Sequence, residues 1–243
     1  MADPAFRPAL LVVDMQEDFC PPNGSLAVPE GRSITPLINT LLALPAATLP
    51  LKIATKDWHP SDHISFASNH PGPPPKRPFL DTTTITNPLN PSGGESYTTR
   101  LWPAHCIQST PGAALIPELN TTHLTHIIEK GTDPRVEMYS AFYCPLNNPR
   151  LPDTDSGLAD LLRSRGTTHV YVVGLAADYC VRSTAEDAVR EGFEAYVIEE
   201  ATRAVEPAGW EACKREMEGN GVRVVGWEGL EVRRLFGGGE EVS

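Results

Sequence analysis

Short apolar runs rich in β-branched residues recur along the chain, and longer segments separate them. The runs span 9–13, 51–55, 126–130, 169–174, 194–199 and 222–226. Runs of this length are typical of strands that are buried on both faces of a parallel sheet. The segments between them have apolar residues at helical spacing, and some end at a glycine, a common helix stop. These predicted helices span 33–44, 156–166, 180–192 and 206–221.

Strands and helices therefore alternate over the whole length. This alternation predicts an α/β fold with a mainly parallel six-stranded sheet and helices on both of its faces. A length of 243 residues suits a single domain, and a hydrophobic content of 40% is sufficient for a large core. We therefore expect one domain over residues 1–243.

One region interrupts this alternation. Residues 58–104 show no convincing periodicity, and eight of the 24 prolines lie between Pro60 and Pro91. A long irregular segment inside a regular domain indicates a functional loop, so we interpret 58–104 as a functional insertion after the second strand. The glycine-rich end, 236–243, is typical of a flexible tail.

Charge and cysteine content narrow the class of protein. The formal net charge of −11 repels phosphate backbones and anionic lipid, so we expect neither a nucleic-acid nor a membrane partner. No apolar run approaches the ~20 residues of a membrane span, and the start does not have the pattern of a secretory signal. The five cysteines are scattered and form no CxxC pair, which is typical of free thiols inside the cell. We expect a cytoplasmic protein, with the nucleus and the peroxisome left open.

Reactive side chains follow several of the predicted strands. In open parallel sheets, ligands bind beyond the carboxyl ends of the strands. Asp14 follows the first run, Asp57 and His59 follow the second, and Lys130 ends the third. Cys180 stands where the strand 169–174 leads into a helix. We expect these groups to converge at one edge of the sheet.

Cys180 is a candidate nucleophile because a helix amino terminus favours the thiolate. Asp14 could accept the thiol proton, and Lys130 could stabilise negative charge between them. Each residue also has a plainer interpretation, as a buried structural cysteine, a turn-capping aspartate and a surface lysine. Their joint position at three strand ends favours the chemical interpretation.

Asp57 and His59 form a candidate metal site. In extended chain, side chains two residues apart point to the same side, so both can reach one ion. His63, His70 and His105 are the histidines that could add a further ligand, although the turn around 60–70 could equally be a solvated loop. Mixed nitrogen and oxygen ligands suit zinc, iron(II) or manganese.

Six segments together resemble the nicotinamidases of the isochorismatase-like cysteine hydrolase superfamily. They are DMQEDF (14–19), DWHPSDHISFASNH (57–70), LWPAHC (101–106), EKGTD (129–133), YSAF (139–142) and GLAADYCV (174–181). Their order and spacing match over roughly the first 200 residues, and the proline-rich insertion resembles that of fungal members. The resemblance implies a three-layer isochorismatase-like fold.

The resemblance also implies residue roles. It implies a catalytic triad of Asp14, Lys130 and Cys180, and an oxyanion hole made by the backbone N–H groups of Ala176 and Cys180. A cis peptide would join Leu175 to Ala176.

For the metal, the resemblance implies one divalent ion, with zinc as the first expectation and iron or manganese as alternatives. Its protein ligands would be Asp57, His59 and His105. His63 would lie behind them or contact metal-bound water, and His70 would belong to the loop.

The implied reaction is hydrolysis of nicotinamide to nicotinate and ammonia through a thioester on Cys180. The metal would orient the pyridine ring, and Phe19, Trp58 and Tyr143 are the candidate aromatic walls. The alternatives are another hydrolase of the superfamily, acting on isochorismate, a ureidoacrylate or an N-carbamoyl compound, and a binding protein without activity. A homo-oligomer is left open.

Overall fold

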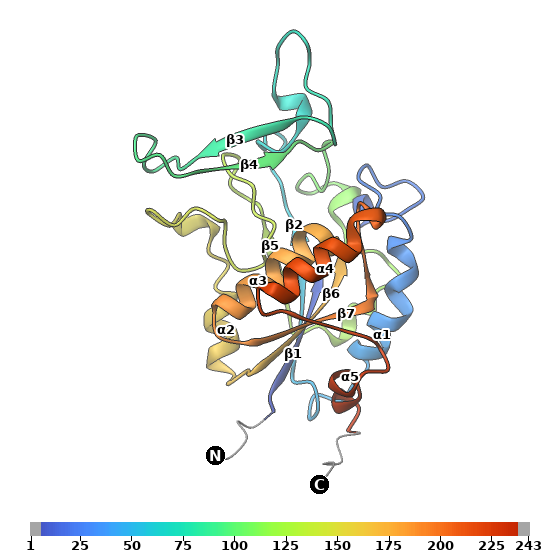
Figure 1. Cartoon of the computed structure of the whole chain (residues 1–243). Helices are drawn as coiled ribbons and strands as arrows, with labels where there is room; N and C mark the ends of the chain where they lie inside the picture. The colour runs from blue at the N-terminus through green and yellow to red at the C-terminus, as the bar shows by residue number, and fades with distance from the viewer. Residues whose placement is uncertain (1–5, 238–243) are drawn as a thin grey trace.

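The computed structural model describes residues 6–237 and contains, in that part of the chain, a six-stranded parallel sheet in the order β5-β2-β1-β6-β7-β8 (Figure 1). Its strands are β1 Pro8–Val13, β2 Leu51–Asp57, β5 His126–Lys130, β6 His169–Leu175, β7 Glu194–Arg203 and β8 Arg223–Val225. The predicted α/β class and the six predicted strands are confirmed.

Helices cover both faces of this sheet. The helices are α1 Thr35–Leu42, α2 Leu158–Ser164, α3 Arg182–Arg190, α4 Trp210–Gly219 and α5 Leu230–Leu235. α1 and α5 contribute to one buried apolar cluster, and α2, α3 and α4 contribute to the other. Short 3-10 turns connect the elements at Glu17–Phe19, Gly31–Ile34, Ala67–Asn69, Pro111–Ala113, Thr121–His123, Pro152–Thr154 and Pro207–Gly209.

The apolar run of β1 explains why the sheet has two cores. Leu10 and Val12 belong to the cluster under α1, whereas Leu11 and Val13 belong to the cluster under α3. All four side chains are fully buried. Burial of a Leu or Val side chain contributes about 1.5–3 kcal/mol, so a strand that is apolar at every position is stable only between two layers.

The insertion contains a hairpin that the sequence pattern did not predict. β3 Thr82–Thr86 and β4 Ser96–Arg100 pair antiparallel and lie apart from the main sheet (Figure 1). The expectation of an irregular segment was therefore wrong for these residues. β3 reads TTTIT, and its one apolar residue, Ile85, packs into a small separate cluster with Val136 and Met138. One apolar contact per strand gives too little alternation to detect.

The carboxyl-terminal prediction is tested only at its start. Phe236 directly follows α5, and its ring contacts Trp227 with the ring centroids 6.0 Å apart. The rest of the predicted tail, 238–243, lies outside the described residues. Between residues 6 and 237, no helix has both the length and the apolar character needed to cross a bilayer.

Candidate active site

The three residues predicted to form a triad meet in the interior, at the carboxyl edge of the sheet. Asp14 follows β1, Lys130 ends β5, and Cys180 lies in a π-helical turn, Ala177–Val181, between β6 and α3. The Lys130 Nζ lies 3.0 Å from Asp14 Oδ2 and 3.4 Å from the Cys180 Sγ. A carboxylate, an ammonium and a thiol are thus brought within contact distance by three separate strands.

Burial sets the protonation of this cluster. Burial raises the pKa of Asp14, although the nearby Lys130 ammonium opposes the shift. Burial also raises the pKa of the Cys180 thiol well above its ordinary value, again against the effect of Lys130. Burial alone would lower the pKa of Lys130, but Asp14 and Asp57 hold it well above the ordinary lysine value. The lysine is therefore charged, the thiol is protonated at rest, and Asp14 has an increased affinity for a proton.

Thr55 fixes the orientation of Asp14, a role that the sequence analysis missed. The Thr55 hydroxyl donates to Asp14 Oδ1 over 2.6 Å and accepts from the Asp14 backbone N–H over 3.2 Å. Both residues are completely buried. The period-2 pattern of β2 puts Thr55 on the same side as Asp57, which is the signal that could have found it.

The three predicted metal ligands lie together beside the triad. One ligand atom each of Asp57, His59 and His105 lies within 4.8 Å of the other two, and all three residues are buried. Asp57 Oδ2 lies 3.5 Å from His59 Nε2 and 3.9 Å from His105 Nε2. The other oxygen of Asp57, Oδ1, accepts from Lys130 over 2.5 Å. Asp57 therefore links the triad to the histidine pair.

The orientation of the two histidines fits a metal ion. The Nδ1 atoms of His59 and His105 are each 2.8 Å from a backbone carbonyl, of Gly131 and Pro103 respectively. These bonds leave Nε2 of each ring as the ligand atom. His59 Nε2 is buried and has no hydrogen-bond partner among residues 6–237. A buried nitrogen without a partner is costly, and a cation held by two imidazoles and a carboxylate would satisfy it.

His63 and His70 have other positions. The His63 Nδ1 is 2.8 Å from the Ser65 hydroxyl and its Nε2 is 3.0 Å from the Val136 carbonyl, so both ring nitrogens are engaged. The ring stacks on that of His59 with the centroids 4.0 Å apart. His63 is thus placed behind a candidate metal ligand, and His70 bonds the Ile64 carbonyl within the loop.

Gln16 and Asp18 hold the metal-site backbone, and neither was singled out from the sequence. Gln16 accepts from the Asp57 N–H and donates to the Asp57 carbonyl, each over 2.8 Å. Asp18 accepts from the N–H of Cys106, next to His105, over 2.7 Å. Cys106 has a φ of 46°, so the chain turns sharply directly after His105. Both residues belong to the segment DMQEDF (14–19), and their spacing from Asp14 in this segment is the sequence signal that could have found them.

Four aromatic side chains line a narrow pocket in front of Cys180. They belong to Phe19, Trp102, Tyr139 and Tyr179, and Asp57, His105 and Ala176 complete the wall. Trp102, Tyr139 and Tyr179 were not predicted from the sequence.

Of the predicted aromatic walls, Phe19 alone lines this pocket. Trp58 instead packs under the Lys56 ammonium, which lies 3.8 Å from the ring centroid. Tyr143 lines a different cavity, and the Arg150 guanidinium lies 4.1 Å from the centroid of its ring.

The segment before Cys180 has the backbone that the resemblance implies. The peptide between Leu175 and Ala176 is cis, which confirms this expectation. Gly174 has a φ of 106°, and a Cβ on it would lie 2.1 Å from the Val13 carbonyl oxygen. Only glycine fits here, because β6 and β1 approach closely where β6 leads toward the turn that holds Cys180.

Comparison with known proteins identifies the family. The model of the isochorismatase domain matches residues 8–229. This chain belongs to the isochorismatase family.

Within the isochorismatase family, the relatives include nicotinamidases, as the resemblance predicted. A nicotinamidase of Acinetobacter baylyi is 41% identical over 216 residues, which cover 88% of this chain and 90% of the relative. The crystal structure of the yeast nicotinamidase bound to the inhibitor nicotinaldehyde has a TM-score of 0.81 at 34% identity, covering 90% of this chain and 99% of that one. A Pyrococcus horikoshii pyrazinamidase in complex with zinc has a TM-score of 0.67 at 36% identity, covering 90% and 99%.

Proposed function

We propose that this chain hydrolyses nicotinamide to nicotinate and ammonia. The observation that carries the proposal is the position of the Lys130 ammonium, 3.0 Å from the Asp14 carboxylate and 3.4 Å from the Cys180 thiol. The activity of the relatives supports the choice of substrate.

In the first half-reaction Asp14 accepts the proton of the Cys180 thiol. The raised pKa of Asp14 suits a general base, because a carboxylate of ordinary acidity would hold this proton poorly. The thiolate sulfur attacks the amide carbon, and a C–S bond forms as the carbonyl oxygen becomes an oxyanion. The backbone N–H groups of Ala176 and Cys180 would stabilise it, which contributes about 3–4 kcal/mol per donor.

Collapse of the tetrahedral intermediate breaks the C–N bond. Asp14 returns its proton to the leaving nitrogen, and ammonia departs from a thioester on Cys180. In the second half-reaction Asp14 takes a proton from water, and the water oxygen attacks the thioester carbon. The C–S bond then breaks, Asp14 returns its proton to the Cys180 sulfur, and nicotinic acid leaves and loses its own proton to solvent as nicotinate. Lys130 remains charged throughout, because two carboxylates hold its pKa high.

One divalent cation, with zinc as the first choice, would be held by Asp57, His59 and His105. When bound, it would supply a Lewis-acidic position for the pyridine nitrogen. The zinc-bound relative and the buried, unpartnered His59 Nε2 support this assignment. Phe19, Trp102, Tyr139 and Tyr179 would hold the ring in front of Cys180.

Two further proposals concern the insertion and the location of the protein. We assign the insertion 58–104 a role in the site, because His63 stacks on His59 and Trp102 lines the pocket. We place the protein inside the cell, and its five cysteines, all free and buried in the structure, support this.

Ammonia release from nicotinamide tests the function. We expect turnover by the wild type and a loss of at least a thousandfold in Cys180→Ala, with Cys213→Ala as the control because that thiol lies in α4. Isochorismate, a ureidoacrylate and N-carbamoyl amides are tested in parallel. Turnover of one of these without turnover of nicotinamide would overturn the proposal, as would full activity of Cys180→Ala.

A further inference from the structure

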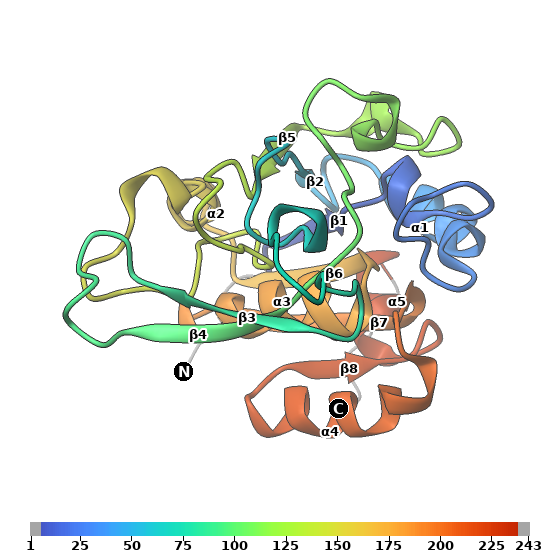
Figure 2. The same cartoon turned by 90° about the horizontal axis from the view of Figure 1, so that it is seen from above.

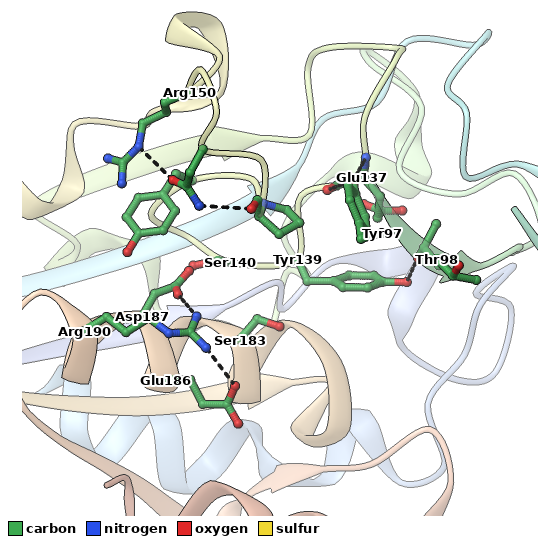
Figure 3. A pocket seen from close by; sticks show the side chains of 14 residues that line it. Tyr97, Thr98, Glu137, Tyr139, Ser140, Arg150, Ser183, Glu186, Asp187 and Arg190 are labelled. Atoms are coloured by element: carbon green, nitrogen blue, oxygen red, sulfur yellow. Dashed lines mark hydrogen bonds and ion pairs between the residues drawn. The ribbon is translucent and has the colours of Figure 1, made fainter. Parts of the chain in front are cut away.

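A second cavity lies directly behind the aromatic pocket. Its volume is about 560 Å³, and the side chains that line it come from β4, the long loop after β5, and α3 (Figure 3). The course of these three segments can be followed in Figure 2. A volume of this size is within the range of small-molecule sites. The chemistry proposed above uses none of it.

Tyr139 is the one described residue that lines both the cavity and the pocket of Cys180. Its hydroxyl is 2.8 Å from the Thr99 hydroxyl, which belongs to the cavity wall. It also accepts from the indole N–H of Trp102, a residue of the catalytic pocket, over 2.9 Å. Two hydrogen bonds therefore hold the Tyr139 hydroxyl, one to a residue of each lining, and the ring forms a partition between the two spaces. Figure 3 shows the side chain beside the β4 residues at one end of the cavity.

The two arginines of the cavity are already paired with carboxylates, whereas Glu137 Oε2 is buried without a hydrogen-bond partner in the part of the chain that the structure describes. Arg190 contacts Asp187 and Glu186, and Arg150 lies 3.4 Å from Asp155. Figure 3 shows the α3 members of this set along one wall, away from the Tyr139 ring. Because both arginines are paired, an anionic group entering the cavity would lose hydration without gaining a free cation, and it would also meet the carboxylate of Glu137. Uncharged, ring-sized groups suit it better, since Tyr97, Tyr143 and the hydroxyl of Ser183 are also on its wall.

We infer that Tyr139 determines substrate size, and that the cavity behind it would accept the substituent of a larger aromatic carboxamide once this side chain is removed. The inference rests on the proposed amide hydrolysis and deepens it. With Tyr139 in place, the pocket in front of Cys180 takes a bare pyridine carboxamide. Without it, the pocket and the cavity become continuous, and pyridine carboxamides with an uncharged ring substituent become substrates.

The test compares kcat/KM for nicotinamide with that for nicotinamides carrying a phenyl group at ring carbon 4, 5 or 6. For at least one phenyl isomer, we expect Tyr139→Ala to raise the ratio of phenyl substrate to nicotinamide at least tenfold over wild type. Tyr139→Phe keeps the ring and should leave the ratio within about threefold. Tyr143→Ala is the matched control, because it enlarges the cavity without opening the partition. Adding Ser183→Phe to Tyr139→Ala refills the cavity and should reverse the gain.

Tyr139→Leu removes the ring with a smaller loss of packing, and it replaces Tyr139→Ala if that variant folds poorly. It should also raise the ratio of kcat/KM for the phenyl substrate to that for nicotinamide. Binding of the phenyl substrates to Cys180→Ala, with and without Tyr139→Ala, is measured by calorimetry and needs no turnover. An absence of nicotinamide hydrolysis by the wild type would count against the proposed function alone. An unchanged ratio and unchanged binding in the Tyr139 variants, or an equal gain in Tyr143→Ala, would overturn the inference.

Discussion

At the scale of single residues, two buried carboxylates beside one ammonium differ in their affinity for a proton. Asp14 and Asp57 are both buried and both lie within 3.0 Å of the Lys130 ammonium. Burial dominates for Asp14 and raises its pKa. For Asp57, burial is outweighed by Lys130 and then His59, which lower its pKa. The neighbouring histidines of Asp57 therefore separate the proton affinities of the two aspartates, which supports the two proposed roles.

The raised pKa of Asp14 predicts the acid limb of the pH profile. The carboxylate form is required, so activity falls as the pH decreases through the pKa of Asp14 in the folded protein. Because that pKa is raised, the decline begins at a higher pH than for an aspartate of ordinary pKa, about 3.9. The measurement is kcat/KM against pH with metal content checked at each point. A profile that is flat down to the ordinary aspartate range would contradict Asp14 as the base.

We predict that removal of the Asp18 side chain lowers the affinity for the metal, although Asp18 is not one of the proposed ligands. Asp18→Ala removes the acceptor for the Cys106 N–H and releases the turn that follows His105. Loss of such a support typically weakens metal binding 10–100-fold, so we expect about that factor. Zinc affinity by competition with a chromophoric chelator measures it. Asp62→Ala, an exposed position in the same histidine-rich stretch, should leave the affinity unchanged.

At the scale of elements, strand ends and the turns after them create the site. Lys130 ends β5, and Gly131 directly after it has a φ of 67°. The Gly131 carbonyl accepts from His59. A Cβ on Gly131 would lie 2.4 Å from His59 Cε1, so this one turn places both the proposed catalytic lysine and a proposed metal ligand.

We therefore predict that Gly131→Ala lowers both the stability of the fold and the affinity for zinc. The left-handed backbone costs about 1 kcal/mol for alanine, and the clash displaces the His59 ring, so metal binding should also fall at least tenfold. Gly192 has a φ of 89°, and a Cβ on it would meet no atom of the described residues within 4 Å, so Gly192→Ala separates the two effects. Urea unfolding and zinc titration of both variants are the measurements. Equal zinc affinity in the two variants would disprove the steric argument.

At the scale of the whole molecule, the metal site joins segments that are far apart in sequence. Asp57 ends β2, and His105 lies 48 residues later, beyond the β3–β4 hairpin (105 − 57 = 48). An ion bound to both would stabilise the folded chain, because the unfolded chain does not hold these ligands together.

We therefore predict that removal of the metal lowers the melting temperature of the protein. Zinc at about 100 times its Kd contributes about 2.7 kcal/mol, which for a domain of this size corresponds to roughly 5–10 °C. Calorimetry with and without a chelator measures the shift. His105→Ala should abolish the zinc-dependent shift in melting temperature. His123→Ala should retain the shift, because His123 is not one of the proposed ligands.

The sequence by itself determined the sheet, the flanking helices other than α5, and the reactive side chains at the strand ends. These follow from local rules, since apolar periodicity and strand-end position are visible in a single chain.

Tertiary structure decided the rest. The β3–β4 hairpin has one apolar anchor, Ile85, and Lys52 in β2 is buried because its ammonium donates to the Leu42 carbonyl at the end of α1. Trp102, Tyr139 and Tyr179 reach Cys180 from three different segments, and Trp58 lies under Lys56 instead. The direction of a side chain in a loop depends on the partners that packing supplies, and no periodicity encodes those partners.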